Sequence, residues 1–91
     1  MKIQREIELL IKREFEPHEL QIVNESFKHQ VPPGSESHFM LEFASLKFQG
    51  KSPVQRQRMV FQALKELLRE KIHALSLKCW TPQEWQQRLC Q

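Results

Sequence analysis

Residues 24–39 read N-E-S-F-K-H-Q-V-P-P-G-S-E-S-H-F and separate two runs whose pattern is typical of β-strands. The stretch holds two of the four histidines, His29 and His38, two adjacent prolines and one of the two glycines. Pro33 and Gly34 favour a type II turn, because proline fixes φ and glycine accepts a positive φ. A connection of this length is too long for a tight hairpin, and long loops in small domains are commonly binding segments. We therefore expect this loop to contribute to a functional site.

On the N-terminal side of the loop, the sequence predicts a helix and then a strand. Isoleucine and leucine recur at helical spacing over residues 2–14, with lysine, arginine, glutamine and glutamate between them. Pro17 ends this helix, because the residue before a proline is driven out of the helical region. Residues 20–25 read L-Q-I-V-N-E, which is short and partly alternating and favours a first strand.

On the C-terminal side, the sequence predicts two further strands and two further helices. Residues 38–48 alternate as a second strand, and Ser52 and the proline after it are typical of a helix start. The apolar spacing carries that helix to about residue 69. Residues 72–79 alternate as a third strand, and Thr81 begins a second capping pattern, T-P-Q-E, that opens a short last helix.

The order of these elements, α-β-β-α-β-α, predicts a small α/β domain with a three-stranded mixed sheet. Consecutive strands one and two can pair antiparallel, whereas the β-α-β unit formed by strands two and three favours a parallel crossover. Strands two and three then start at the end of the sheet where strand one finishes. His73 would therefore lie near His29 and His38, and Cys79 would lie at the opposite end.

Length and composition fit one domain spanning residues 1–91. Hydrophobic residues make up 40 % and charged residues 27 % of the chain, as in ordinary soluble domains. No apolar run approaches the roughly 20 residues of a membrane span, and the first residues do not resemble a targeting peptide, so we expect a cytoplasmic protein. The net charge of +3 is mild for a protein committed to nucleic acid. The two cysteines form no metal or disulfide motif and are expected to be free thiols.

Each histidine of the expected cluster has a structural alternative. His73 can be a histidine at the edge of the core, satisfied by a backbone carbonyl. His38 can serve only to pin the loop by hydrogen bonding, and His29 can be a solvated loop residue. Their expected convergence favours a shared role, because neutral imidazole is a good ligand for iron, zinc and copper. Two histidines without a clear third protein ligand make a poor closed zinc site, and better suit a half-site that another molecule completes.

Several separate motifs resemble the BolA family. They are N-E-S-x-x-H-x-V-P-x-G-S-E-S-H-F, F-x-G-x-S-x-x-x-R-x-R, I-H-A-L and T-P-x-E-W, and they agree in order and spacing over about residues 20–85. The resemblance implies a small α/β fold similar to the class II KH fold, which agrees with the element order above.

The resemblance implies a partner and a cofactor. BolA-like proteins pair with monothiol glutaredoxins and share a [2Fe-2S] cluster, to which the glutaredoxin brings its cysteine and a glutathione thiol. The family's ligand histidine lies in I-H-A-L, here His73, and the loop histidine of the matching subgroup is His29. We accordingly expect a non-enzymatic protein in iron–sulfur cluster handling or iron regulation. Isolated, it should be a monomer or weak homodimer without a cluster.

The resemblance also implies an alternative function, because some BolA-like proteins are described as DNA-binding transcription regulators of stress response and cell morphology. The candidate nucleic-acid contacts are Lys51, Arg56 and Arg58, at a helix start whose amides favour phosphate. These residues can equally be a solvated basic helix end. The chain has no G-x-x-G loop, and it departs from the family's R-H-R at Gln57, which reads R-Q-R.

An enzyme is the weakest of the three hypotheses. A thiol nucleophile needs an adjacent base, but the expected topology separates Cys79 from the histidines.

Overall fold

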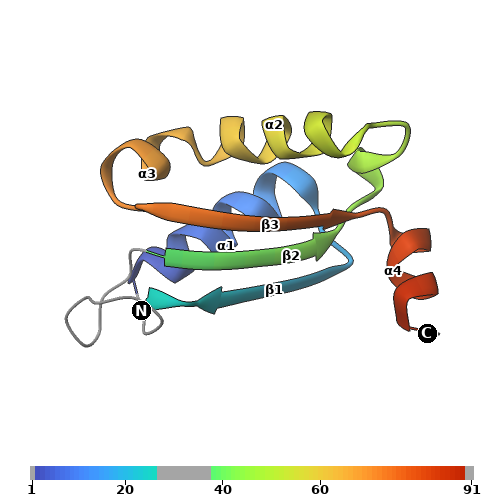
Figure 1. Cartoon of the computed structure of the whole chain (residues 1–91), viewed down its shortest axis with the longest axis horizontal. Helices are drawn as coiled ribbons and strands as arrows, with labels where there is room; N and C mark the ends of the chain where they lie inside the picture. Colours follow the sequence, from blue (N-terminus) through green and yellow to red (C-terminus); the bar gives the residue numbers. More distant parts are fainter. Residues whose placement is uncertain (1, 27–37, 90–91) are drawn as a thin grey trace.

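The computed structural model describes residues 2–26 and 38–89, which form one three-stranded sheet with helices packed against it (Figure 1). In chain order the elements are α1 (Lys2–Phe15), β1 (Glu19–Asn24), β2 (His38–Ala44), the 3-10 turn η2 (Leu46–Phe48), α2 (Pro53–Ala63), α3 (Lys65–Glu70), β3 (Ala74–Trp80) and α4 (Pro82–Leu89). Within the described ranges, no helix is long and apolar enough to cross a bilayer.

The sheet has the strand order β1-β2-β3, with β2 in the centre. β1 pairs antiparallel with β2, and β2 pairs parallel with β3, so that His38 is aligned with Ala74 at one end and Ala44 with Trp80 at the other. The mixed sheet and its element order, predicted from the chain order, are confirmed. The parallel pair brings the starts of β2 and β3 to the same end of the molecule.

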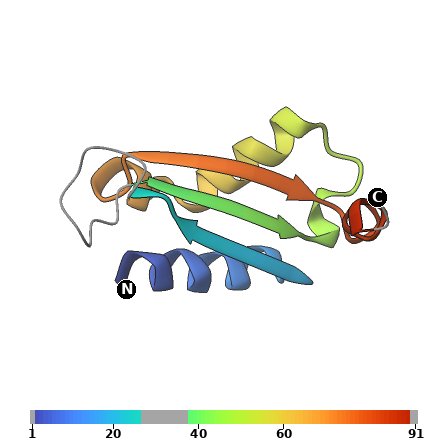
Figure 2. The ribbon, with the colours of Figure 1, turned by 60° about the horizontal axis from the view of Figure 1, so that its bottom comes forward.

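The hydrophobic core lies between one face of the sheet and the helices. α1 runs along β1 and α2 along β3 on this face, whereas α4 lies beyond the ends of β2 and β3 (Figures 1 and 2). Phe39, Leu41 and Phe43 of β2 point into the core and are at most 2 % exposed. Phe15 and Phe48 complete an aromatic group with Phe43, with ring centroids 5.2–5.3 Å apart. Such tilted aromatic pairs add about 0.5–1.5 kcal/mol each to the gain from burial alone.

The second strand is shorter than predicted, because it ends at Ala44 and not at residue 48. The cause is Ser45, which is fully buried and whose hydroxyl donates to the Phe15 carbonyl oxygen at 2.7 Å. The hydroxyl oxygen of Ser45 also accepts a hydrogen bond from the Lys47 backbone N–H at 3.2 Å and caps the η2 turn. The turn directs Phe48 into the core. A straight strand would instead have carried this residue past the end of the sheet.

The predicted helix over residues 53–69 is divided at Leu64. This residue has a φ of −101° and a ψ of 12°, outside the helical region, and separates α2 from α3. The third strand starts at residue 74 and not at residue 72, because the backbone N–H of Ile72 donates to the Leu67 carbonyl and closes the end of α3. Ile72 is therefore a buried core residue of the helix-to-strand connection.

Candidate functional site

His38 and His73 lie side by side at the end of the sheet where β2 and β3 start. Their ring centroids are 5.5 Å apart, with the ring planes tilted by 53°. His38 is the first residue of β2, and His73 immediately precedes β3, so the parallel register sets the spacing. We call these two residues the histidine rim. The predicted convergence is confirmed for this pair, whereas His29 lies outside the described residues.

The backbone of His38 is fixed to the end of β1. Its N–H donates to the hydroxyl oxygen of Ser26 at 3.1 Å, and its carbonyl accepts from the N–H of Glu25 at 2.7 Å. Ser26 is 3 % exposed, and its own N–H donates to the side chain of Asn24 at 3.0 Å. The start of β2 is therefore held by hydrogen bonds to the two residues that follow β1. These bonds fix the backbone position of His38, from which its ring extends.

His73 is exposed, and the alternative of a histidine at the edge of the core is therefore wrong. It borders a shallow hollow whose lining is Leu68, Arg69, Glu70, Lys71, Ile72 and His73. The neighbouring cations are paired: Arg69 lies 2.8 Å from Glu66, and Lys71 lies 3.4 Å from Glu6. The ring of His73 is thus accessible to a second molecule at a part of the surface where the positive charge is largely balanced.

The histidine rim is an incomplete ligand set by itself. Among residues 2–26 and 38–89, no three histidine, cysteine, aspartate or glutamate side chains gather closely enough to hold a metal ion. A closed structural zinc site needs four protein ligands. Two neighbouring imidazoles can contribute donors to a site whose remaining ligands come from elsewhere.

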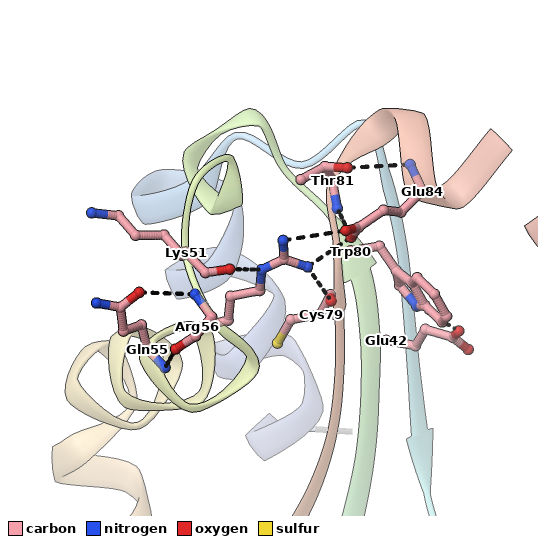
Figure 3. Close-up of polar contacts among 9 residues, drawn as sticks. Glu42, Lys51, Gln55, Arg56, Cys79, Trp80, Thr81 and Glu84 are labelled. Carbon is pink, nitrogen blue, oxygen red and sulfur yellow. Dashed lines mark hydrogen bonds and ion pairs between the residues drawn. The ribbon is translucent and has the colours of Figure 1, made fainter. Parts of the chain in front are cut away.

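At the other end of the sheet, Arg56 is the centre of a partly buried polar cluster (Figure 3). Its side chain is 12 % exposed and forms a two-point ion pair with Glu84, at 2.7 and 3.3 Å. The guanidinium also donates to the carbonyl oxygens of Cys79, at 3.2 Å, and Lys51, at 3.0 Å. This Arg56 cluster joins the start of α2 to the end of β3 and to the start of α4.

The cluster also closes the predicted N-terminal cap of α4. The N–H of Thr81 donates to Oε1 of Glu84 at 2.9 Å, and the N–H of Glu84 donates to the Thr81 hydroxyl at 3.2 Å. The pKa of the Glu84 carboxyl is lowered from its ordinary value of 4.5. The largest cause is the hydrogen bond from Arg56, and the next is the hydrogen bond from the Thr81 backbone. Arg56 therefore has an internal structural role, which accounts for it without a nucleic-acid contact.

The other two predicted nucleic-acid contacts, Lys51 and Arg58, are exposed. Lys51 extends away from the Arg56 cluster (Figure 3). Ser52 caps α2, accepting from the Gln55 N–H at 3.2 Å, and the Gln55 side chain returns a bond to the Ser52 N–H at 2.8 Å. This confirms the predicted capping box. The basic surface at this helix start consists of two side chains and not of three.

Cys79 lies far from the histidine rim, as predicted, since it is aligned with Phe43 near the opposite end of β2. Burial raises the pKa of its thiol to about 11 from an ordinary 9.0, and the Arg56 guanidinium offsets only part of that rise. A thiol nucleophile needs the reverse shift. The geometry therefore gives no support to the cysteine-enzyme hypothesis.

Comparison with known proteins decides the family of this chain. Residues 11–84, which include the histidine rim and the Arg56 cluster, match the family described as BolA-like protein. The chain belongs to the BolA-like family. The resemblance inferred from the sequence motifs is confirmed.

Individual relatives agree with this assignment. The chain is 48 % identical over 85 residues to the DNA-binding transcriptional regulator BolA of Vibrio cholerae, covering 93 % of this chain and 80 % of that protein. The solution structure of BolA1 protein from Mus musculus superposes with a TM-score of 0.89 at 37 % identity, covering 98 % and 72 % of the two chains. The BolA domain of SufE1 from Arabidopsis thaliana gives a TM-score of 0.86 at 34 % identity, covering 92 % and 96 %. None of these names describes an enzyme.

Two features of this BolA-like chain were not predicted from its sequence. The first is the internal role of Arg56: an R-x-R motif gives no sign that one arginine turns inward, and Glu84 is 28 residues away. The second is the packing of the His38 ring beside the His73 ring. The parallel topology predicted that these residues would be near each other, but not that their rings would be adjacent. Gln57, which replaces the histidine of the family motif, is exposed.

Proposed function

We propose that this BolA-like chain is a non-enzymatic partner of a monothiol glutaredoxin and that it supplies imidazole ligands to a [2Fe-2S] cluster shared by the two proteins. The observation that carries the proposal is the exposure of His73 at a rim where a second imidazole, that of His38, lies 5.5 Å away. The chain would act in iron–sulfur cluster handling or in iron regulation.

The chemistry of the rim fits such a cluster. Imidazole is a suitable ligand for iron, and mixed cysteine and histidine ligation raises the reduction potential of a [2Fe-2S] centre above that of an all-thiolate centre. His73 is the first proposed ligand, and His29 remains the proposed second. The missing thiolates would come from the glutaredoxin cysteine and from glutathione. The two proteins would therefore complete one site, and the isolated chain would carry no cluster.

The surface around His73 is suited to contact with a partner. The ring borders an open hollow at the end of α3, and no element of the described structure covers it. His73 immediately precedes β3, so the pairing of β3 with β2 sets its backbone position before a partner binds.

The proposal is tested by mixing the isolated chain with a cluster-loaded monothiol glutaredoxin under anaerobic conditions. We expect a heterodimer by size-exclusion chromatography that carries the cluster. Its visible circular dichroism should differ from that of the glutaredoxin alone. If the two proteins elute separately and the glutaredoxin spectrum is unchanged, the proposed function is wrong.

A second function, regulation of transcription by DNA binding, is favoured by the name of the Vibrio cholerae relative. In this chain the candidate surface is the start of α2, where the side chains of Lys51 and Arg58 are exposed. This surface lies at the opposite end of the sheet from the histidine rim (Figure 1). The two functions would therefore use different residues and can be separated by mutation.

Fluorescence anisotropy with a labelled duplex tests the second function. Binding should weaken as salt is added, because contacts to phosphate release counterions. A Lys51→Ala/Arg58→Ala variant should bind more weakly, whereas His73→Ala should bind as the wild type does. No measurable affinity at low salt, or equal affinity of the double variant, would exclude this surface.

A further inference from the structure

We propose that His38 and His73 form a binding site for a single tetrahedral transition-metal ion, Zn²⁺ in the first place, in the chain without any partner. This site differs from the shared cluster in its occupant and needs no second protein. The inference rests on the geometry of the two rings and not on the proposed function.

The distance between the two rings matches a tetrahedral metal ion. A metal bound in the ring plane lies about 3.2 Å from the imidazole centroid, because the Zn–N bond is about 2.0–2.1 Å and the nitrogen lies about 1.1 Å from the centroid. Two imidazoles on one tetrahedral ion therefore have centroids about 5.2 Å apart, and two at a right angle about 4.5 Å. The observed distance is 5.5 Å, which is closer to the tetrahedral value than to the right-angle value.

The relative tilt of the rings is also compatible with a shared ion. Rings stacked in parallel would direct their nitrogen lone pairs into separate planes. The planes of His38 and His73 are inclined by 53°, so they intersect, and an ion on the line of intersection can lie in both. Because His73 is exposed, its ring can adjust without displacing core atoms.

The backbone already holds the two ligands in place. His38 and His73 begin adjacent parallel strands, and the His38 backbone is bonded to Ser26 and Glu25. Binding a metal therefore requires little ordering of the chain, which reduces its entropic cost. Lys71 and Arg69, which line the hollow together with His73, are paired with glutamates, and this limits repulsion of a cation.

The ligand type selects the class of metal. Neutral imidazole suits Zn²⁺, Cu²⁺ and Ni²⁺, whereas Ca²⁺ and Mg²⁺ prefer oxygen ligands. With two protein ligands from the described residues, water fills the other positions of a tetrahedral ion. Such a site is open and exchangeable, in contrast to a closed structural zinc site.

The test is a titration of the tag-free chain with Zn²⁺ in competition with a chromophoric indicator, in the absence of glutaredoxin. We expect one ion per chain, and an affinity that falls more than about tenfold in both His38→Ala and His73→Ala, since loss of even a supporting residue of a metal site costs about 10–100-fold. His18→Ala is the matched control, because His18 is an exposed histidine whose backbone is bonded to Ala44 at the far end of the sheet. It should leave the affinity unchanged.

Three results would overturn the inference. They are equal losses in His18→Ala and His73→Ala, a loss in His29→Ala with none in His38→Ala, and weak, unsaturable binding by the wild type. His38→Gln, which keeps a polar side chain at the strand start, guards against a folding defect in His38→Ala, and it should lose Zn²⁺ affinity while its far-ultraviolet circular dichroism is unchanged.

Substitution with Co²⁺ reports the geometry directly. Tetrahedral Co²⁺ has visible absorption bands far stronger than those of the octahedral ion, so the wild type should develop them and His38→Gln should not. A purely octahedral spectrum would contradict the tetrahedral assignment. Because neither assay contains a cluster or a glutaredoxin, both can fail while the proposed function holds, and both can succeed while it fails.

Discussion

Arg56 and Glu84 form a two-point ion pair, with Nη1–Oε1 and Nη2–Oε2 distances of 2.7 and 3.3 Å, between the first turns of α2 and α4. The planar guanidinium matches the carboxylate in this geometry, which a lysine could not reproduce. Since α4 lies beyond the sheet, the pair is a principal polar connection between α4 and the rest of the domain (Figure 3).

Replacement of Arg56 by alanine should destabilise the domain. The change removes hydrogen bonds to Glu84 and to the carbonyls of Cys79 and Lys51, and we expect a loss of about 1.5–3 kcal/mol in the free energy of unfolding. Urea denaturation measures it. Arg58→Ala, at an exposed position of the same helix, is the matched control and should change the value by no more than about 0.5 kcal/mol. Equal effects of the two variants would disprove the internal role of Arg56.

The contribution of Glu84 to stability should depend on pH. Its pKa is lowered in the folded chain, so the folded state binds the proton less readily than the unfolded state does. The stabilisation is therefore fully present above the ordinary pKa of 4.5 and is lost as the pH falls through the lowered pKa. The wild type should exceed Glu84→Gln in unfolding free energy near neutral pH, and that advantage should shrink as the pH falls below 4.5.

The same comparison in an Arg56→Ala background provides the control. Because the Arg56 hydrogen bond is the largest cause of the lowered pKa, the pH dependence of the Glu84→Gln difference should shrink there. A difference that stays constant with pH in the wild-type background would show that Glu84 does not titrate as the structure requires.

The Cys79 thiol should react slowly. A rise of the pKa from 9.0 to about 11 lowers the thiolate fraction near neutral pH about a hundredfold, and only the thiolate is nucleophilic. A Cys90→Ser variant isolates Cys79, since the chain has two cysteines, Cys79 and Cys90. Its reaction with a chromogenic disulfide should be at least that much slower in the native than in the urea-unfolded state. Comparable rates would mean that burial does not raise the pKa of the Cys79 thiol in the folded chain.

The sequence was sufficient for the features that depend on local pattern and chain order. Alternation and capping signals located the start of each strand, and those of α1, α2 and α4, to within a few residues, but not the break at which α3 begins. The β-α-β rule placed His38 and His73 at one end of the sheet. The early end of β2 was not foreseeable, because it depends on a hydrogen bond from Ser45 to Phe15, 30 residues away in sequence.

The Arg56 cluster shows the same limit. Arg56 and Arg58 are equivalent in a pattern of basic residues at a helix start, and only the packing of α2 against β3 decides which one turns inward. The burial of a long charged side chain requires a partner that local sequence does not reveal. Candidate nucleic-acid contacts read from basic motifs therefore need a test of burial before they are assigned.

The most direct test of the proposed function compares the visible circular dichroism of three glutaredoxin heterodimers. They contain the wild-type chain, His73→Ala or His18→Ala. His18 lies at the end of the sheet away from the rim and controls for the loss of an exposed histidine. We predict that the wild type and His18→Ala give the same heterodimer spectrum and that His73→Ala gives a different spectrum or no cluster-bound heterodimer. An unaltered heterodimer spectrum in His73→Ala would show that this imidazole is not a cluster ligand and would contradict the account.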